Sequence, residues 1–157
     1  LHSLRRRQRQ MCIRDSLMAR RARAITVYAI DMNPVAIHYL IRNVRANKVM
    51  GSVVPVLSDA GAVVRRGLSG LADRVVMNLP EKAKEFLESA CEALRPEGGI
   101  LHFYTFAGAP EPEREAMDVL KTGIRRAGRK IKRILLTRKV RAIAPRRWQV
   151  VVDAEVA

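Results

Sequence analysis

The sequence predicts an α/β fold built on a doubly wound sheet that is mostly parallel and ends in an antiparallel pair of strands. From residue 24 onward, apolar β-branched runs alternate with amphipathic helical patterns, which is the arrangement of βαβ units. The last two apolar runs have no helix between them, so we expect them to pair antiparallel. The 157 residues are 48% hydrophobic and 29% charged, an ordinary composition for one domain with a core.

The first regular elements are a strand and a helix. Residues 24–31, AITVYAID, form a continuous apolar run that suits a strand covered on both faces. Asn33 can cap the following helix, and Pro34 suits its first turn. Ile37 and Leu40 fall on one face of that helix, which we expect to pack on the sheet.

The middle of the chain continues the alternation. Residues 52–59, SVVPVLSD, predict a second strand, and Pro55 within it indicates a position near a sheet edge. Residues 61–70 predict a short helix or loop, and residues 73–78, DRVVMN, predict the third strand. The clearest helix runs over residues 83–94, where apolar residues recur every three or four positions until RPEGG ends it.

The last third predicts a strand, a helix and two closing strands. Residues 100–106, ILHFYTF, form the fourth strand. The helix over residues 110–128 has acids in its first turn and arginines in its last, which matches the helix dipole. Residues 130–144 and 147–156 are the closing strands, separated at Ala144-Pro145.

The chain is strongly basic, with a net charge of +15 and a pI near 11.1. The first 25 residues carry +7 of this charge, which leaves +8 for the rest. Such a balance indicates a polyanionic partner, most simply nucleic acid. Residues 121–147 contain twelve Lys or Arg and no acid; we expect most on a solvated face and a subset facing RNA.

Several classes of protein are disfavoured. No apolar run reaches the roughly 18 residues that cross a bilayer. Cys12 and Cys91 have no metal-ligand spacing, so we expect no metal and reduced thiols in a cytoplasm. No G-x-G-x-x-G follows a strand, which argues against a nicotinamide-dinucleotide oxidoreductase.

Residues 1–16 show neither a helical nor a strand period. We interpret them as a non-native or disordered basic segment, because MCIRDS looks like a translated sequencing-adaptor remnant. The alternative is a basic RNA-binding arm.

Polar residues directly follow three predicted strands: Asp31, Asp59 and Asn78. Ligands of open α/β sheets lie beyond the carboxyl ends of strands, so we expect the three to converge on one crevice. The Asp31 carboxylate can accept from a ribose diol, and that of Asp59 from an adenine amino group. The Asn78 side chain offers one hydrogen-bond donor and one acceptor, and Pro80 has no backbone N–H. Such a turn suits binding to the edge of a flat heterocycle. Each alone could equally be a capping residue.

A family resemblance joins these segments. VYAIDMNPVAIHYLIRN, VLSDA, RVVMNLPEKAKEFLESA, EGGILHFYTF and APRRWQVVVDAEV together resemble archaeal-type tRNA (guanine-37, N1) methyltransferases, which are class I S-adenosylmethionine enzymes with a Rossmann-like sheet. The resemblance runs from about Leu17 to the end. It implies a cofactor site made by Asp31, Met32, Asp59, Ala60 and Asn78. It also implies that Asn78 and Pro80 form the catalytic shelf for the target base, with tRNA as partner in the cytoplasm.

The chain departs from the family pattern in two places. Gly61-Ala62 stands where an Arg-Glu pair is usual, and the family's first strand and glycine-rich turn should precede Leu17. We therefore interpret residues 17–157 as a partial, N-terminally truncated S-adenosylmethionine-dependent methyltransferase domain, poorly active alone and lacking the general base. His38 is expected on the surface and His102 as a satisfied core or site-wall residue.

Two other functions stay open. One is the aminocarboxypropyl transferase of wybutosine synthesis, which uses the same cofactor pocket but resembles the chain less at Asn78-Leu79-Pro80. The other is a non-catalytic basic RNA-binding module. If no strand lies between those ending at Asp31 and Asn78, we expect an unpaired sheet centre or one filled by a segment near Leu17.

Overall fold

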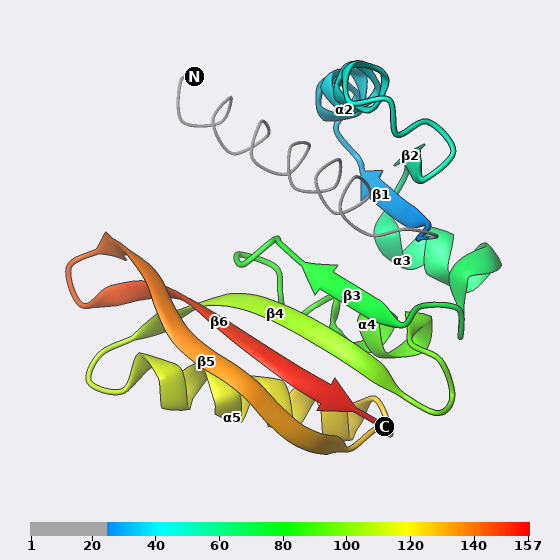
Figure 1. Cartoon of the computed structure of the whole chain (residues 1–157). Helices are drawn as coiled ribbons and strands as arrows, with labels where there is room; N and C mark the ends of the chain where they lie inside the picture. Colours follow the sequence, from blue (N-terminus) through cyan, green and yellow to red (C-terminus); the bar gives the residue numbers. More distant parts are fainter. Residues whose placement is uncertain (1–24) are drawn as a thin grey trace. The chain divides into compact units, whose positions relative to one another are not determined.

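A computed structural model describes residues 25–157, which form two compact units that divide after Ala62 (Figure 1). Each unit is described by itself. The interpretations of residues 1–16, and of a segment near Leu17 that fills the sheet, lie outside the described residues.

The first unit is a βαβ crossover. Strand β1 (Val27–Asp31) leads into helix α2 (Pro34–Ala46), which returns to strand β2 (Val53–Leu57). The two strands are parallel and in register from Val27 opposite Val53 to Asp31 opposite Leu57. The predicted strand, helix and strand are therefore confirmed in type and order.

Helix α2 begins where the sequence indicates. The Asn33 side chain accepts a hydrogen bond from Val35 N (2.9 Å), and Pro34 occupies the first turn. Its apolar face packs against both strands and makes the small core of this unit. That core consists of Ala29, Ile37, Leu40, Val44, Val49 and Val53.

The second unit follows a helical connection made by α3 (Ala60–Val63) and a π-helical turn, η1 (Val64–Leu68). Its elements are β3 (Arg74–Met77), α4 (Leu87–Ala93), β4 (Gly99–Gly108), α5 (Pro112–Arg126), β5 (Ile131–Ala144) and β6 (Arg147–Val156). The strand order is β3-β4-β6-β5 (Figure 1). Strand β3 is parallel to β4, whereas β6 is antiparallel to both of its neighbours. The predicted antiparallel pair at the end of the chain is confirmed.

Among the described residues the strands form two sheets, where the sequence predicted one. Within residues 25–157, β1 pairs only with β2, and β3 pairs only with β4. Each sheet therefore ends at a parallel strand whose second edge has no partner in the described part of the chain. Whether the sheet centre is unpaired or filled near Leu17 stays a prediction, because that segment lies outside the described residues.

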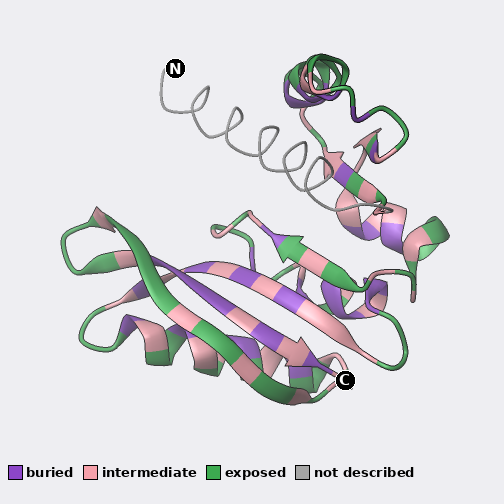
Figure 2. Cartoon of the chain, viewed as in Figure 1, coloured by how far each residue is buried: buried purple, intermediate pink, exposed green. Residues whose placement is uncertain are grey.

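The core of the second unit lies between its sheet and helices α4 and α5. Along β4, buried residues alternate with half-buried ones, which Figure 2 shows as bands of two colours. Leu101 and Phe103 face the helices and are fully buried, as are Leu120 and Ile124 of α5. This period of two is the pattern of a sheet with a single packed face.

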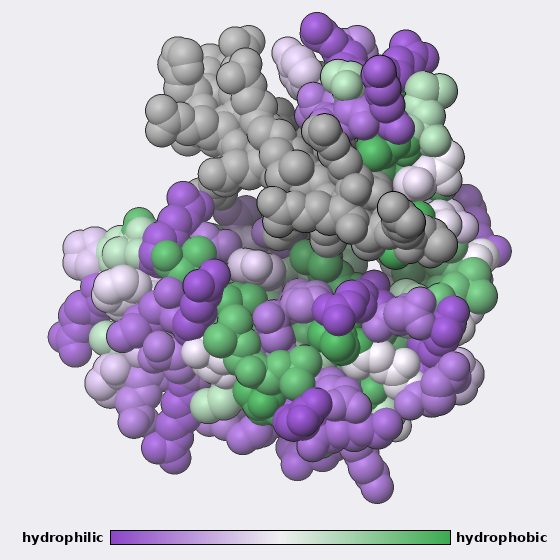
Figure 3. All heavy atoms as spheres, viewed as in Figure 1, coloured by the Kyte–Doolittle hydropathy of each residue, from purple (hydrophilic) through white to green (hydrophobic). Residues whose placement is uncertain are grey.

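Strand β5 is an edge strand interrupted by bulges. One register shift lies between Ile134 and Leu136, so the consecutive side chains of Leu135 and Leu136 are both exposed, at 41% and 42%. On the face viewed in Figure 3, groups of hydrophobic residues lie among hydrophilic ones. Bulges and charges of this kind protect an edge strand from pairing with another chain.

Helix α4 begins later than predicted, at Leu87 in place of residue 83. Lys82 N and Glu85 N donate to the carbonyls of the residues three positions earlier, which makes turns and not α-helix. Ala83 is nevertheless buried, as the helical pattern required.

A single arginine secures the carboxyl end of α4. Arg129 donates to the carbonyl oxygens of Leu94 (2.9 Å), Cys91 (3.2 Å), Arg95 (2.8 Å) and Pro96 (3.2 Å). The carbonyls of Cys91 and Leu94 are of the kind that the end of a helix leaves without an internal partner, and those of Arg95 and Pro96 belong to the loop that follows. Burial raises the pKa of the neighbouring Cys91 thiol to about 11, against a smaller opposing effect of Arg129, so the thiol is neutral.

No helix within residues 25–157 is long and apolar enough to cross a bilayer. In the same part of the chain, no cluster of His, Cys, Asp and Glu has the arrangement of a metal site.

We predict that Arg129→Met lowers the free energy of unfolding by about 2 kcal/mol, because several carbonyls lose a charged donor that water replaces only in part. Arg125→Met, at an exposed position of α5, removes the same charge and should change stability by less than about 0.5 kcal/mol. Urea denaturation followed by circular dichroism measures both. Equal losses in the two variants would contradict the capping role.

Candidate functional site

Two predicted site residues share one edge of the first unit. Asp31 is the last residue of β1 and lies opposite Leu57, the last residue of β2; Asp59 follows two positions later. Ser58 N donates to Asp31 O (3.2 Å), which ties the two strand ends together. Because β1 and β2 are parallel, both aspartates lie at the carboxyl edge, where such sheets bind ligands.

Each of these aspartates also holds a local turn. Asp31 Oδ1 accepts from Asn33 N, and Asp59 Oδ1 accepts from Ala62 N, both at 2.9 Å. The capping roles considered from the sequence are therefore present. The second oxygen, Oδ2, of each carboxylate accepts no hydrogen bond from the rest of residues 25–157.

The neighbours of the two aspartates differ in exposure. Met32, directly after Asp31, is 69% exposed, and Ala60, directly after Asp59, is half-buried. An exposed thioether beside a carboxylate gives this edge an apolar surface next to an acceptor, a combination that suits a nucleoside.

Asn78 lies at the corresponding edge of the second unit. It follows Met77, the last residue of β3, and it is half-buried. Its side-chain amide forms no hydrogen bond with the part of the chain that the structure describes. Leu79 beside it is 47% exposed, and its carbonyl accepts from Lys82 N (3.1 Å) in the turn that contains Pro80.

The structure thus brings Asp31 and Asp59 to one edge of the first unit and puts Asn78 at the carboxyl edge of the second. The convergence of all three on one crevice stays a prediction.

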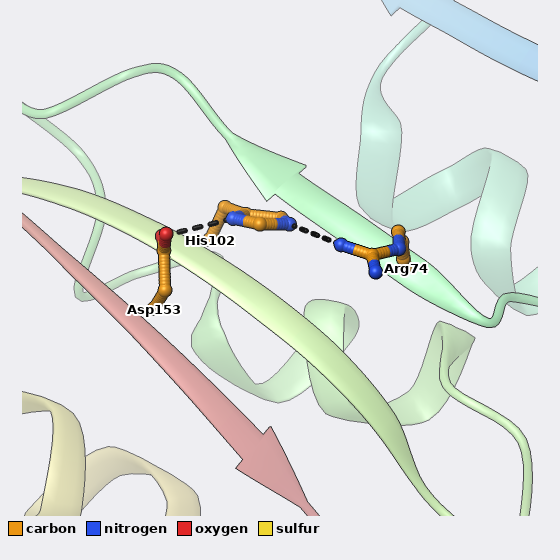
Figure 4. Close-up of polar contacts among 3 residues, drawn as sticks. All are labelled: Arg74, His102 and Asp153. Atoms are coloured by element: carbon orange, nitrogen blue, oxygen red, sulfur yellow. Dashed lines mark hydrogen bonds and ion pairs between the residues drawn. The ribbon is translucent and has the colours of Figure 1, made fainter. Parts of the chain in front are cut away.

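His102 takes part in a polar chain across three strands (Figure 4). Its Nδ1 is 2.8 Å from Asp153 Oδ1, and its Nε2 is 3.3 Å from Arg74 Nη1. A guanidinium only donates, so Nε2 is the acceptor and Nδ1 carries the proton that is donated to Asp153. Both ring nitrogens are therefore engaged, as expected of a satisfied histidine and not of a general base.

The position of His102 agrees with this interpretation. It lies opposite Val76 within β3, inside the sheet and before the carboxyl edge. His38 is exposed on α2, as predicted. Trp148 packs against the core, with Lys139 Nζ 5.2 Å from its ring centroid, so it serves strand packing.

Sequence reasoning missed two features of the second unit. The partners of His102, Arg74 and Asp153, depend on the register between distant strands, which no local pattern reveals. The backbone of Arg146 has a positive φ of 56°. Here a signal existed, because a proline in a two-residue hairpin turn commonly requires positive φ at the next residue.

The comparisons with known proteins identify relatives over most of the chain. The sequence model of the TRM5/TYW2 methyltransferase domain matches residues 16–136. The chain is 36% identical over 141 residues to tRNA (guanine(37)-N(1))-methyltransferase Trm5b of Pyrococcus abyssi, covering 90% of the chain and 40% of that protein. It is 33% identical over 138 residues to tRNA(Phe) (4-demethylwyosine(37)-C(7)) aminocarboxypropyltransferase of Methanocaldococcus jannaschii, covering 88% and 53%.

Solved structures agree in fold. TYW2 of M. jannaschii in complex with AdoMet superposes with a TM-score of 0.76 at 34% identity, covering 83% of the chain and 57% of that structure. Trm5b of P. abyssi gives 0.72 at 36% identity, covering 84% and 38%. A complex of aTrm5 and tRNALeu gives 0.65 at 32% identity, covering 84% and 35%. The chain spans between 35% and 57% of the length of these relatives.

We predict that Asn78→Ala changes the free energy of unfolding by less than about 0.5 kcal/mol, because the amide has no partner to lose among the described residues. Asp59→Ala removes the acceptor of Ala62 N and should lower stability by about 1 kcal/mol. Thermal denaturation of both variants provides the measurement. A loss for Asn78→Ala as large as that for Asp59→Ala would show that the amide serves the fold.

Proposed function

The chain belongs to the TRM5/TYW2 methyltransferase family, and from this premise we propose that it transfers a methyl group from S-adenosylmethionine to N1 of guanine 37 of a tRNA. The observation that carries the choice of a base-modifying reaction is the half-buried amide of Asn78, which has no partner among residues 25–157 and lies at the end of β3. The full activity, substrate and cellular setting are part of this proposal, and we place the reaction in the cytoplasm.

The residues of the first unit fit the adenosine part of the cofactor. The free Oδ2 of Asp31 is proposed to accept from the ribose diol, with the exposed side chain of Met32 beside it. The free Oδ2 of Asp59 is proposed to accept from the adenine amino group, next to Ala60. Both carboxylates are oriented by their own turns, so the cofactor would find these acceptors already in place.

The proposed shelf in the second unit would position the acceptor base. When bound, S-adenosylmethionine supplies an electrophilic methyl group, and the protein supplies alignment. The Asn78 amide can donate to one edge atom of guanine and accept from another, while Pro80 has no N–H to compete. The guanine must leave the stack of the anticodon loop to reach this shelf.

Proton removal from guanine N1 needs a general base. His102 holds its proton on the nitrogen that faces Asp153, and its other nitrogen is occupied by Arg74. His38 is exposed on α2, in the first unit. We therefore propose that the chain on its own transfers methyl groups slowly, because neither histidine of its described residues is suited to act as the base.

One specific observation favours a second candidate function. The TYW2 structure matches the fold with a TM-score of 0.76, against 0.72 for Trm5b, at similar sequence identity. An aminocarboxypropyl transfer would use the same cofactor from a different carbon of its sulfonium. The group added to the tRNA distinguishes the two reactions, because a methyl adds one carbon and an aminocarboxypropyl group adds four.

We predict that the chain binds S-adenosylmethionine and that Asp31→Asn weakens binding by about tenfold or more, since a charged acceptor of the ribose diol becomes neutral. The substitution keeps an oxygen for Asn33 N, so the turn survives. Asp118→Asn, at an exposed position of α5, is the matched control and should bind S-adenosylmethionine as the parent chain does. Isothermal titration calorimetry measures all three, and equal affinities would remove Asp31 from the site.

We predict that a large excess of the chain methylates a tRNA transcript with guanine at position 37 and that Asn78→Ala reduces the yield at least tenfold, because the base loses its paired hydrogen bonds. Mass spectrometry of the digested tRNA reports the added group, and a transcript with adenine at position 37 is the control. A four-carbon adduct on a tRNA that carries 4-demethylwyosine at position 37, tested in parallel, would establish the second candidate. RNA binding without any adduct or cofactor binding would leave a non-catalytic RNA-binding module.

A further inference from the structure

The turn between β5 and β6 holds an arginine in an unfavourable backbone conformation. Ala144 pairs with Arg147, so Pro145 and Arg146 form a two-residue turn. Arg146 has a φ of 56°, in the left-handed region that glycine or asparagine usually occupies after a turn proline. Ala109 N donates to Arg146 O (2.9 Å), which holds the turn against the loop after β4.

The position of this turn follows from strand register. Arg147 lies opposite Gly108, the last residue of β4, so the turn is at the carboxyl edge of the sheet, as is Asn78 after β3 (Figure 1). Met77 lies opposite Phe103, so β4 continues past β3 by about 16 Å, from five residues at about 3.3 Å each. Arg146 therefore flanks the Asn78 shelf at a distance and does not reach a base held there.

The same register places the cations of the basic tract, residues 121–147, at two opposite edges of the sheet. Its members are Lys121, Arg125, Arg126, Arg129, Lys130, Lys132, Arg133, Arg138, Lys139, Arg141, Arg146 and Arg147. Ile131 lies opposite Val156, which in turn lies opposite Gly99 at the amino end of β4. The cations from Arg129 to Arg133 are thus at the edge away from the shelf, where Arg129 caps α4 and Arg133 pairs with Glu155 (3.4 Å).

The cations near the turn differ in what holds them. Arg141 Nε donates to Gln149 Oε1 (2.9 Å), and the Arg147 guanidinium lies 5.8 Å from the Phe106 ring centroid. Arg146 is exposed, and its side chain forms no hydrogen bond or ion pair with residues 25–157. It is therefore a cation on a fixed turn with its donors free, next to a second cation oriented by an aromatic ring.

We propose that the β5–β6 turn is a contact for the RNA backbone, in which the Arg146 guanidinium binds a phosphate that flanks the target nucleotide and Arg147 supports it. This inference rests on the proposed function, since the shelf defines which nucleotide is the target. A guanidinium matches a phosphate through two parallel hydrogen bonds. Pro145 and the Ala109–Arg146 hydrogen bond fix the turn in advance, which reduces the ordering that binding requires.

The Arg146→Gly variant tests the phosphate contact without destabilising the fold. Glycine relieves the left-handed backbone, so the midpoint of thermal unfolding should stay the same or rise, while the phosphate contact is lost. The binding of a fluorescein-labelled anticodon stem-loop with guanine 37 is followed by anisotropy, with the whole chain and without cofactor. Affinity at low salt should fall by about tenfold, and the slope of log Kd against log salt should decrease by about 0.7.

Lys48→Gly is the matched control. Lys48 has the same φ of 56° and follows α2 on the amino-terminal side of β2, away from the carboxyl edge that holds Asp31. The variant loses the same charge and relieves the same backbone strain, so its thermal midpoint should also stay or rise. Its affinity for the stem-loop should remain within about twofold of the parent chain.

The outcomes separate clearly. A loss of affinity confined to Arg146→Gly supports the proposal. Equal affinities for the two variants, or no binding of the stem-loop by the parent chain, overturn it. Because this measurement uses no cofactor, a failure to bind S-adenosylmethionine or to modify tRNA would refute the proposed function and leave the phosphate contact as measured. Arg146→Asn, which also tolerates positive φ, repeats the test should the glycine variant alter the hairpin.

Discussion

The pairing of β6 with β4 is the constraint on which the second unit depends. The two strands run antiparallel over their full length, from Gly99 opposite Val156 to Gly108 opposite Arg147. This register buries alternate residues of both strands against α5 and puts His102 opposite Asp153 on the other face. It also brings the β5–β6 turn to the carboxyl edge that Asn78 occupies. The core, the polar chain and the position of the turn at the carboxyl edge therefore all follow from this one strand pairing.

The elements that local rules govern could be predicted closely. Helix α2 begins at the cap and proline that the sequence displays, and the bounds of β6 are those predicted. The carboxyl-edge position of Asp31 and Asp59 followed from the parallel pairing of two adjacent strands. The start of α4 was wrong because hydrogen bonds in the turn after Pro80 compete with helix, a choice that apolar spacing does not reveal.

Features set by distant pairing were beyond local rules. The Arg74–His102–Asp153 chain needs three strands in one register, and the division of the strands into two sheets depends on which edges find partners. The two aspartates illustrate a further limit of pattern reading, because capping and ligand binding were treated as alternatives. In the structure one oxygen of each carboxylate holds a turn, and the other accepts no hydrogen bond from residues 25–157, so the two roles are compatible.

Arg129 shows that a residue counted in the net charge need not be a binding residue. Four of its five N–H groups are held by main-chain carbonyls of α4 and the loop behind it. Its positive charge still adds to the long-range field that accelerates the approach of a polyanion. Its guanidinium has few N–H donors left to bind that polyanion directly. Attraction at a distance and recognition at close range are thus assigned to different arginines of one tract, and the net charge measures only the first.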